Sequence, residues 1–339
     1  ELAQMGHFDQ ENIVPGIQPN PEDGTVDITY NLETKSSDQI EFSLGWGATG
    51  LIGTLGLKFS NFAIQNLFNP ESYRIVPQGE GQTFSINART NGVYYTSASV
   101  SFLEPWLGGK RPNSLSTSIF FASQTGYSDR YYQAYQNLYN TYYSYYAYSG
   151  NSNYLQQLQE SEADPNKYLR TFGISLGYVK RLRWPDDYFS FYGELSYQLY
   201  MMKDWPYMIL TDGNSHNLAL NFQLSRSSID NPIYTRRGSQ FTIGLKITPP
   251  YSLIRGTTDA QYAQMSTTEK YNLLEYHKWR FSGKVFTPLT ADSKLVLMAR
   301  ADFGYLGHYN KNVKSPFESF YMGGDGMSSY SSYSTEYIS

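Results

Sequence analysis

The chain has 339 residues, of which 17% are aromatic and 17% are charged, and its formal net charge is −4. Soluble domains carry about a quarter charged residues, and a small negative charge gives no reason to expect nucleic acid as a partner. No window approaches the ~18 consecutive apolar residues of a membrane helix, which excludes the helical class of membrane protein.

Residues 1–36 differ in pattern from the rest of the chain. A turn rich in Pro, Asn, Asp and Gly at 19–24 precedes Val26, Ile28 and Tyr30, which alternate with polar residues. This pattern predicts a short strand in a soluble setting, at the end of a small α/β module.

Residues 37–339 are predicted to form an all-β transmembrane antiparallel β-barrel. About eleven long segments alternate between apolar and polar residues, beginning with residues 38–46. Within 81–102, Phe84, Ile86 and Ala88 alternate with small polar residues, Asn91-Gly92 marks a turn, and the alternation then resumes. One apolar and one polar face suit strands between lipid and a wet lumen. Eleven is an odd number, so we expect further strands beyond Ser339 or from another chain.

The connections between these segments also favour a barrel over a soluble β-sandwich or propeller. Short turns at Asn91-Gly92, Asp186-Asp187 and Thr290–Asp292 are predicted to alternate with long outer loops near 129–167, 250–272 and 308–339. Outer-membrane barrels have short periplasmic turns and longer outer loops.

The longest predicted loop carries tyrosines at three- and four-residue spacing: Tyr132, Tyr135, Tyr139, Tyr142 and Tyr146. This spacing predicts a helical hairpin. The tyrosine stripe either packs inward or forms a docking surface for surface-exposed partner subunits.

Candidate catalytic and metal sites are weak in this sequence. Ser215 and His216 are adjacent, but a serine–histidine site also needs a third, orienting group. With no Cys and no close pair among the four His, the sequence offers no metal site and implies no cofactor. We expect no enzymatic activity.

Four stretches resemble the BamA family of outer-membrane protein assembly factors, in the POTRA-plus-barrel superfamily. They are QMGHF at 4–8 with GTVDITY at 24–30, FLEPWLGG at 102–109, DNPIY at 230–234 with RGS at 237–239, and SPFESFYMGG at 315–324. In this order they cover nearly the whole chain. The family's Arg-Gly-aromatic triplet is absent from 325–339, and we expect it beyond Ser339.

The resemblance implies the end of a POTRA module at 1–36, on the periplasmic side, followed by most of a 16-stranded barrel in a Gram-negative outer membrane. It implies that the first strand is a template, at a lateral seam, for nascent outer-membrane β-barrel proteins, through Ile40, Glu41, Phe42, Ser43, Leu44, Gly45 and Trp46. It implies that the sixth loop begins at Phe317, Glu318, Phe320, Tyr321, Gly323 and Gly324. The implied partners are these clients, accessory lipoprotein subunits and the lipid bilayer.

Two other functions share part of this pattern. A POTRA-barrel pore that exports a dedicated substrate would have the same architecture. A surface phospholipase would depend on Ser215 or His216.

Overall fold

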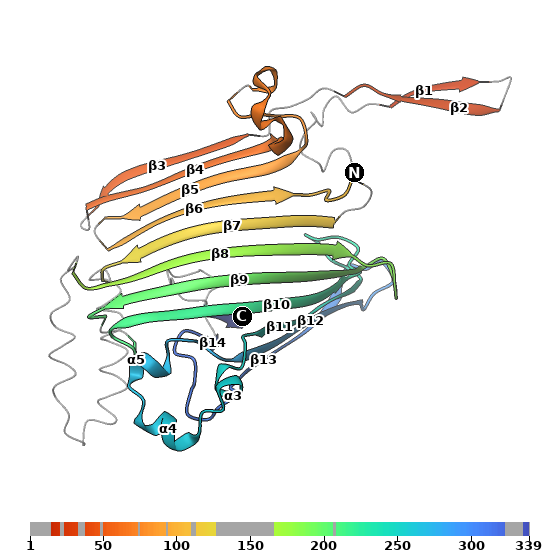
Figure 1. The fold of residues 1–339 in the computed structure, drawn as a ribbon. Helices are drawn as coiled ribbons and strands as arrows, with labels where there is room; N and C mark the ends of the chain where they lie inside the picture. Colours follow the sequence, from red (N-terminus) through yellow and green to blue (C-terminus); the bar gives the residue numbers. More distant parts are fainter. Residues whose placement is uncertain are drawn as a thin grey trace.

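The computed structural model describes residues 15–20, 24–32, 38–47, 50–73, 75–92, 94–109, 113–126, 166–205, 208–322 and 335–338. Strands β1 (Pro15–Asn20) and β2 (Thr25–Tyr30) form an antiparallel hairpin beside the main sheet, with Ile17 opposite Ile28 (Figure 1). The alternation at Val26, Ile28 and Tyr30 therefore corresponds to a strand, as the sequence predicted.

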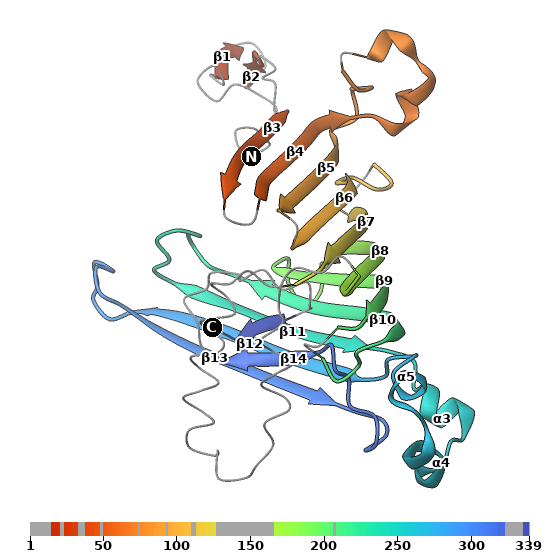
Figure 2. The same ribbon diagram turned by 90° about the vertical axis from the view of Figure 1, so that its left-hand side faces the viewer.

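Eleven consecutive antiparallel strands form one sheet in the order β3 to β13. They are β3 (Gln39–Gly47), β4 (Gly50–Phe62), β5 (Gln82–Asn91), β6 (Tyr95–Glu104), β7 (Asn113–Gln124), β8 (Tyr168–Arg181), β9 (Phe189–Lys203), β10 (Gly213–Ser227), β11 (Gly238–Ile247), β12 (His277–Pro288) and β13 (Val296–Gly307). The all-β antiparallel architecture and the count of eleven are confirmed. Seen along the strands, the sheet curls into a trough (Figure 2).

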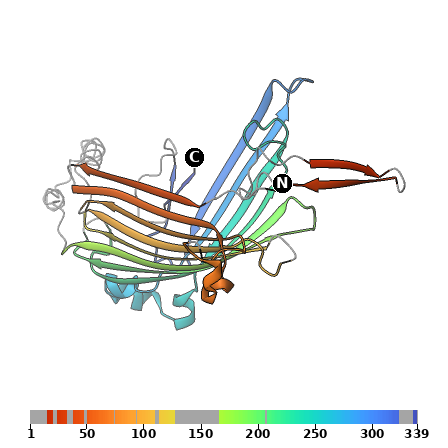
Figure 3. The ribbon, with the colours of Figure 1, turned by 90° about the horizontal axis from the view of Figure 1, so that it is seen from above.

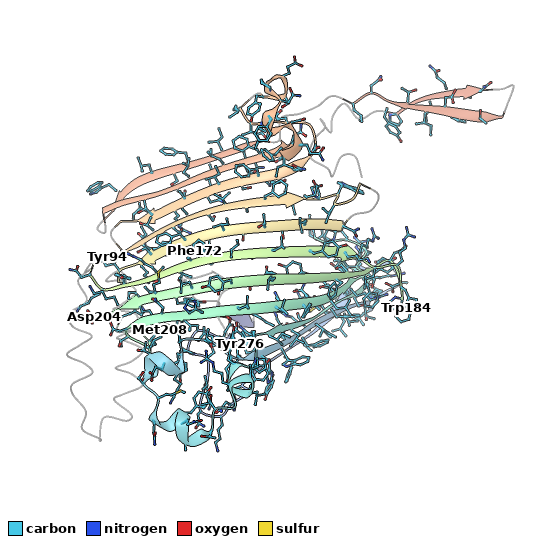
Figure 4. All side chains as sticks on the ribbon, in the orientation of Figure 1. Tyr94, Phe172, Trp184, Asp204, Met208 and Tyr276 are labelled. Carbon is cyan, nitrogen blue, oxygen red and sulfur yellow. The ribbon has the colours of Figure 1, made fainter. Side chains whose placement is uncertain are left out.

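The register of the sheet aligns its apolar residues into continuous rows. Val100 faces Ile86 on one side and Ile119 on the other, and Ile119 in turn faces Ile174. Val100, Ile119 and Ile174 are all exposed, and Phe172 belongs to the same face (Figure 4). Because alternate residues point to opposite faces of a strand, one face of the trough is apolar and meets lipid, and the other is polar.

The two ends of the sheet differ. At one end, where β3 begins, lie the connections 63–81, 105–112, 182–188, 228–237 and 289–295; we call it the turn end. At the opposite, loop end lie 48–49, 92–94, 125–167, 204–212 and 248–276. The predicted alternation of short and long connections was therefore wrong in two places. The Asn91-Gly92 turn lies at the loop end, and 63–81 at the turn end is long.

The predicted outer loops are described to different extents. The helical prediction for Tyr132 to Tyr146 falls outside the described residues. Residues 250–272 contain three short helices, α3 (Tyr251–Arg255), α4 (Asp259–Gln264) and α5 (Thr267–Lys270). Thr258 and Ser266 start α4 and α5 with complete capping boxes, which explains why a polar sequence is ordered there. No helix in the described part of the chain combines the length and apolar character needed to cross a membrane.

In the described residues 308–322, the segment predicted as part of an outer loop at 308–339 lies against the sheet rather than outside it. It leaves the sheet at the loop end and folds back onto the concave side, where Val313, Phe317 and Glu318 are buried (Figure 3). Strand β14 (Ser319–Met322) then pairs in parallel with β15 (Thr335–Ile338). Two residues hold the segment in this position. On the lumen face, Phe317 stacks on the ring of Tyr200, and Glu318 binds the ammonium groups of Lys246 and Lys278.

Candidate functional site

Strand β3 forms one edge of the sheet. In the described part of the chain it pairs only with β4, from Gln39 opposite Lys58 to Gly47 opposite Gly50. All seven predicted template residues, Ile40 to Trp46, lie on this strand. An edge strand presents a row of backbone N–H and C=O groups without a sheet partner, so the strand can accept another strand.

The large apolar side chains of β3 are exposed. Ile40, Phe42, Leu44 and Trp46 share one face, and their exposed fractions are 72%, 69%, 60% and 83%. Glu41 points to the opposite, lumen face, where its side chain lies near Gly56 of β4. The strand thus has an apolar face toward lipid and a polar face toward the lumen, as an incoming barrel strand would also have.

Strand β13 forms the other edge in the described residues. It pairs with β12 along twelve residues, from Val296 opposite Pro288 to Gly307 opposite His277. Its chain then continues into the segment that fills the lumen, whereas β3 follows the N-terminal hairpin.

The lumen face carries a compact polar cluster around Glu318. The Glu318 carboxylate accepts hydrogen bonds from Lys246 Nζ at 2.7 Å and from Lys278 Nζ at 3.0 Å. The exposed fraction of its side chain is 1%, and that of Lys278 is 5%. A buried carboxylate needs such partners, because removing it from water is otherwise costly. Glu318 therefore fixes the segment after β13 to β11 and β12.

A chain of neutral side chains extends this cluster toward β9 and β10. The Tyr276 hydroxyl donates to Glu318 at 2.9 Å, and the Asn217 amide donates to that hydroxyl at 3.2 Å. Asn217 also donates to Gln198, which accepts from the Tyr200 hydroxyl at 2.8 Å. Tyr276 is labelled in Figure 4. The network links four neighbouring strands to one loop residue.

An apolar cluster lies beside this network, at the loop end. Phe317 stacks on Tyr200, with ring centroids 4.2 Å apart and planes 13° apart. The buried members are Leu169, Tyr200, Met202, Trp205, Leu210, Leu274, Tyr276 and Phe317. The cluster joins strands β8 and β9 and two connections of the loop end, 204–212 and 248–276, to the segment after β13.

The predicted beginning of the sixth loop is thus only partly described. Phe317 and Glu318 are buried in the lumen, and Phe320 lies under the Lys278 ammonium at 4.5 Å from the ring centroid. Tyr321 belongs to β14, and Gly323 and Gly324 fall outside the described residues.

Sequence reasoning missed the partners of Lys246, which lies on β11. The register sets Lys246 opposite Lys278, so two like charges are directly adjacent. Like charges in that position are unfavourable without a counter-charge, and this was the signal that an acidic residue had to reach them. A hollow of about 510 Å³ remains beside them, lined by Glu194, Asn221 and Arg280 among others.

The candidate serine–histidine pair has separate partners. The Ser215 hydroxyl donates to the Tyr271 carbonyl at 2.7 Å. His216 Nδ1 lies 2.7 Å from the Tyr197 hydroxyl. Adjacent residues of a strand point to opposite faces, so the two side chains are directed away from each other.

The motif at 230–239 builds a tight turn between β10 and β11. The Asp230 carboxylate accepts hydrogen bonds from the backbone N–H groups of Arg236 and Arg237 at 3.0 and 3.2 Å, which lower its pKa. Asn231 accepts from the amides of Ile233 and Tyr234. The sequence pattern thus reflects turn geometry at this position.

Comparison with known proteins agrees with this geometry. The profile of the Omp85 superfamily domain matches residues 78–337. No curated protein sequence matches the chain. Sixty chains of solved structures match it in fold. One of them is BamA from Haemophilus ducreyi lacking POTRA domains 1–3, with a TM-score of 0.54 and 17% sequence identity. The match covers 96% of this chain and 51% of that chain, so this chain spans about half its length.

Proposed function

This chain belongs to the Omp85 superfamily of outer-membrane β-barrels, and from that membership we propose that it folds and inserts other β-barrel proteins into the outer membrane. The observation that supports the proposal is strand β3, which in the described residues pairs only with β4 and exposes its large apolar side chains. No covalent chemistry is involved.

The driving force is the backbone hydrogen bond in lipid. Unsatisfied N–H and C=O groups in the hydrocarbon layer cost several kcal/mol each. A client strand that pairs with β3 satisfies its own groups and those of the edge in one step, by β-strand addition. Each client strand then offers the next template, so the client grows as a sheet at the lateral seam.

The proposed partners follow from this mechanism. They are nascent outer-membrane barrels at the β3 edge, accessory lipoprotein subunits of an assembly complex, and surface-exposed subunits at the tyrosine-rich loop. Residues 1–36 would be the end of a POTRA module on the periplasmic side.

Reconstitution of the full-length protein in lipid vesicles tests the proposal. Two unrelated client barrels are added in the unfolded state, and their folding rate is followed by heat-modifiable mobility in SDS gels. We expect the protein to speed the folding of both clients.

Proline variants locate the template. The backbone N–H groups of successive residues point to opposite sides of a strand. Of the two variants Phe42→Pro and Ser43→Pro, one therefore removes an N–H that points toward β4, and the other removes an N–H that points toward the open side. We expect the open-side variant to stay folded and to lose most client folding. Ala301→Pro and Asp302→Pro make the same changes at the β13 edge. Loss of activity only in the β13 variants would reject β3 as the template.

Depletion in cells separates an insertase from an export pore. Loss of an insertase lowers many outer-membrane barrels together, whereas loss of a dedicated pore removes one cargo. An unchanged set of barrels after depletion would reject the proposal.

A further inference from the structure

The connection between β4 and β5 exposes an unusual number of apolar side chains. It contains two 3₁₀ helices, η3 (Ile64–Phe68) and η4 (Pro70–Ser72), and projects from the turn end on the convex, lipid-facing side of the sheet (Figures 2 and 3). The exposed fractions are 92% for Phe68, 74% for Ile75, 51% for Ile64 and 44% for both Leu67 and Tyr73.

Several polar groups of this connection are hydrogen-bonded within it or to the first residue of β5. The Asn66 amide donates to the Gln78 carbonyl at 3.0 Å, and the Tyr73 hydroxyl donates to the Leu67 carbonyl at 2.7 Å. The Ile64 amide donates to the side chain of Gln82 at 2.7 Å. A segment whose polar groups bond to one another, and whose apolar side chains point out, is suited to the boundary of a bilayer.

The connection is also tied to the start of β3. Asp38, which immediately precedes β3, accepts from the Ser60 amide at 3.0 Å and from the Gln78 side chain at 3.3 Å. Any force that holds the connection at the membrane is therefore transmitted to the first strand.

The other connections of the turn end indicate whether lipid or protein covers these exposed side chains. Each of them exposes a large apolar residue: Trp106 at 49%, Trp184 at 82%, Tyr234 at 79% and Leu289 at 56% (Trp184 is labelled in Figure 4). Aromatic girdles of this kind mark the interfaces of outer-membrane barrels. The exposed surface at 64–75 continues this girdle, which points to lipid rather than to a protein.

We propose that residues 64–73 and Ile75 form a membrane-interface anchor beside the first strand. Phe68 and Ile75 enter the boundary between headgroups and acyl chains at the turn end, and Asp38 and Gln78 connect this anchor to β3. The anchor fixes the height of the β3 edge in the bilayer. The proposal depends on the barrel spanning a membrane and is independent of the insertase function.

Fluorescence quenching by lipids brominated in their acyl chains tests the anchor. The chain has no native cysteine, so Phe68→Cys and Ile75→Cys can each carry one environment-sensitive label. Gln65→Cys and Glu71→Cys are matched controls, because both residues are exposed in the same connection. The full-length protein is reconstituted alone in vesicles, and heat-modifiable mobility confirms that each variant is folded.

We expect labels at 68 and 75 to lose most of their fluorescence to acyl bromines and to be shielded from aqueous iodide. Labels at 65 and 71 should behave in the opposite way. Equal exposure of all four labels to iodide would overturn the proposal. So would shielding at 68 and 75 that appears in native membranes but not with the purified protein, because the occupant would then be another protein.

Discussion

Strand β3 and the strands β9 to β12 follow the same alternating pattern, yet their surroundings are opposite. Around Glu318, residues 313–319 and strands β9 to β12 form what we call the sealed region, where side chains are buried and hydrogen-bonded. The bare edge, β3, has one neighbouring strand in the described residues and exposes every large apolar side chain. The alternation alone therefore specifies a strand but not its role, which depends on what covers it.

The two regions differ in which polar groups have partners. Polar side chains facing the lumen need partners, and the sealed region supplies them from a loop 40 or more residues away in sequence. Backbone groups at a membrane edge also need partners, and in the described residues β3 has a partner strand on one side only. Substituting the same residue type in both regions tests whether the contrast is real.

Removing the carboxylate should show the largest difference. Glu318→Ala leaves the buried Lys278 and the partly buried Lys246 as adjacent charges without this counter-ion, and the loss of a buried ionic partner costs about 3–5 kcal/mol. Glu41→Ala on β3 removes an exposed carboxylate and should change the free energy of unfolding by less than about 0.5 kcal/mol. Urea titration of the refolded barrel, followed by tryptophan fluorescence, measures both.

Glu318→Gln refines this prediction, because it keeps the shape and the acceptor for Tyr276 while it removes the charge. We expect an intermediate loss of stability. Equal stability of the unsubstituted protein, Glu318→Ala and Glu318→Gln would mean that the ion pairs do not hold the loop.

Truncating a phenylalanine should have the next largest effect. Phe317→Ala removes a buried ring from its stack on Tyr200 and should cost about 3 kcal/mol. Phe42→Ala removes a ring that is 69% exposed, so it should cost less than about 1 kcal/mol. Limited proteolysis at 308–319 adds a local readout, since only Phe317→Ala should accelerate cleavage there. Faster cleavage in both variants would indicate general loosening of the fold.

Adding a methyl group to a glycine tests the backbone of the two regions. At Gly238, where β11 begins, φ is 110° and an added Cβ would lie 2.2 Å from the Ser228 carbonyl oxygen. Gly238→Ala should therefore cost about 1–3 kcal/mol. At Gly45 on β3 the nearest atom would be 3.9 Å away, so Gly45→Ala should be nearly neutral. Thermal unfolding of both variants checks the difference, and a neutral Gly238→Ala would show that the turn adjusts.

The smallest effect should come from pH at the Asp230 turn. Hydrogen bonds from the Arg236 and Arg237 amides lower the pKa of Asp230, so the ionised carboxylate stabilises the turn. That contribution is complete above the ordinary pKa of about 4 and disappears as pH falls through the lowered value. The protection of the Arg236 and Arg237 amides against exchange, measured relative to the intrinsic rate at each pH, should then decrease at low pH. Asp230→Asn should show weaker protection already at neutral pH, and unchanged protection would contradict this assignment.

The sequence was sufficient to predict the sheet because its signal is local. The eleven strands, the first strand at 38–46 and the lipid-facing rows through Val100 and Ile119 all follow from two-residue alternation. Alternation repeats along each strand and depends only on which face meets lipid.

The sealed region was harder to predict because its contacts are distant in sequence. Glu318 lies 72 residues from Lys246 and 42 from Tyr276, and no local pattern joins them. Two further features could not be predicted from local pattern. They are the path of residues 308–322 and the end of the sheet at which Asn91-Gly92 turns. The role of β3 as a template remains a prediction.

Cysteine cross-linking along β3 tests the central claim most directly. Single cysteines are placed at each position from Ile40 to Trp46 of the full-length protein, and in turn along the terminal strand of a client stalled during assembly. Matched positions on β13 serve as the control. The account predicts disulfides between β3 and the client, with the preferred client position shifting by one residue for each step along β3. Absence of client disulfides at every β3 position, or an equal yield from β13, would contradict it.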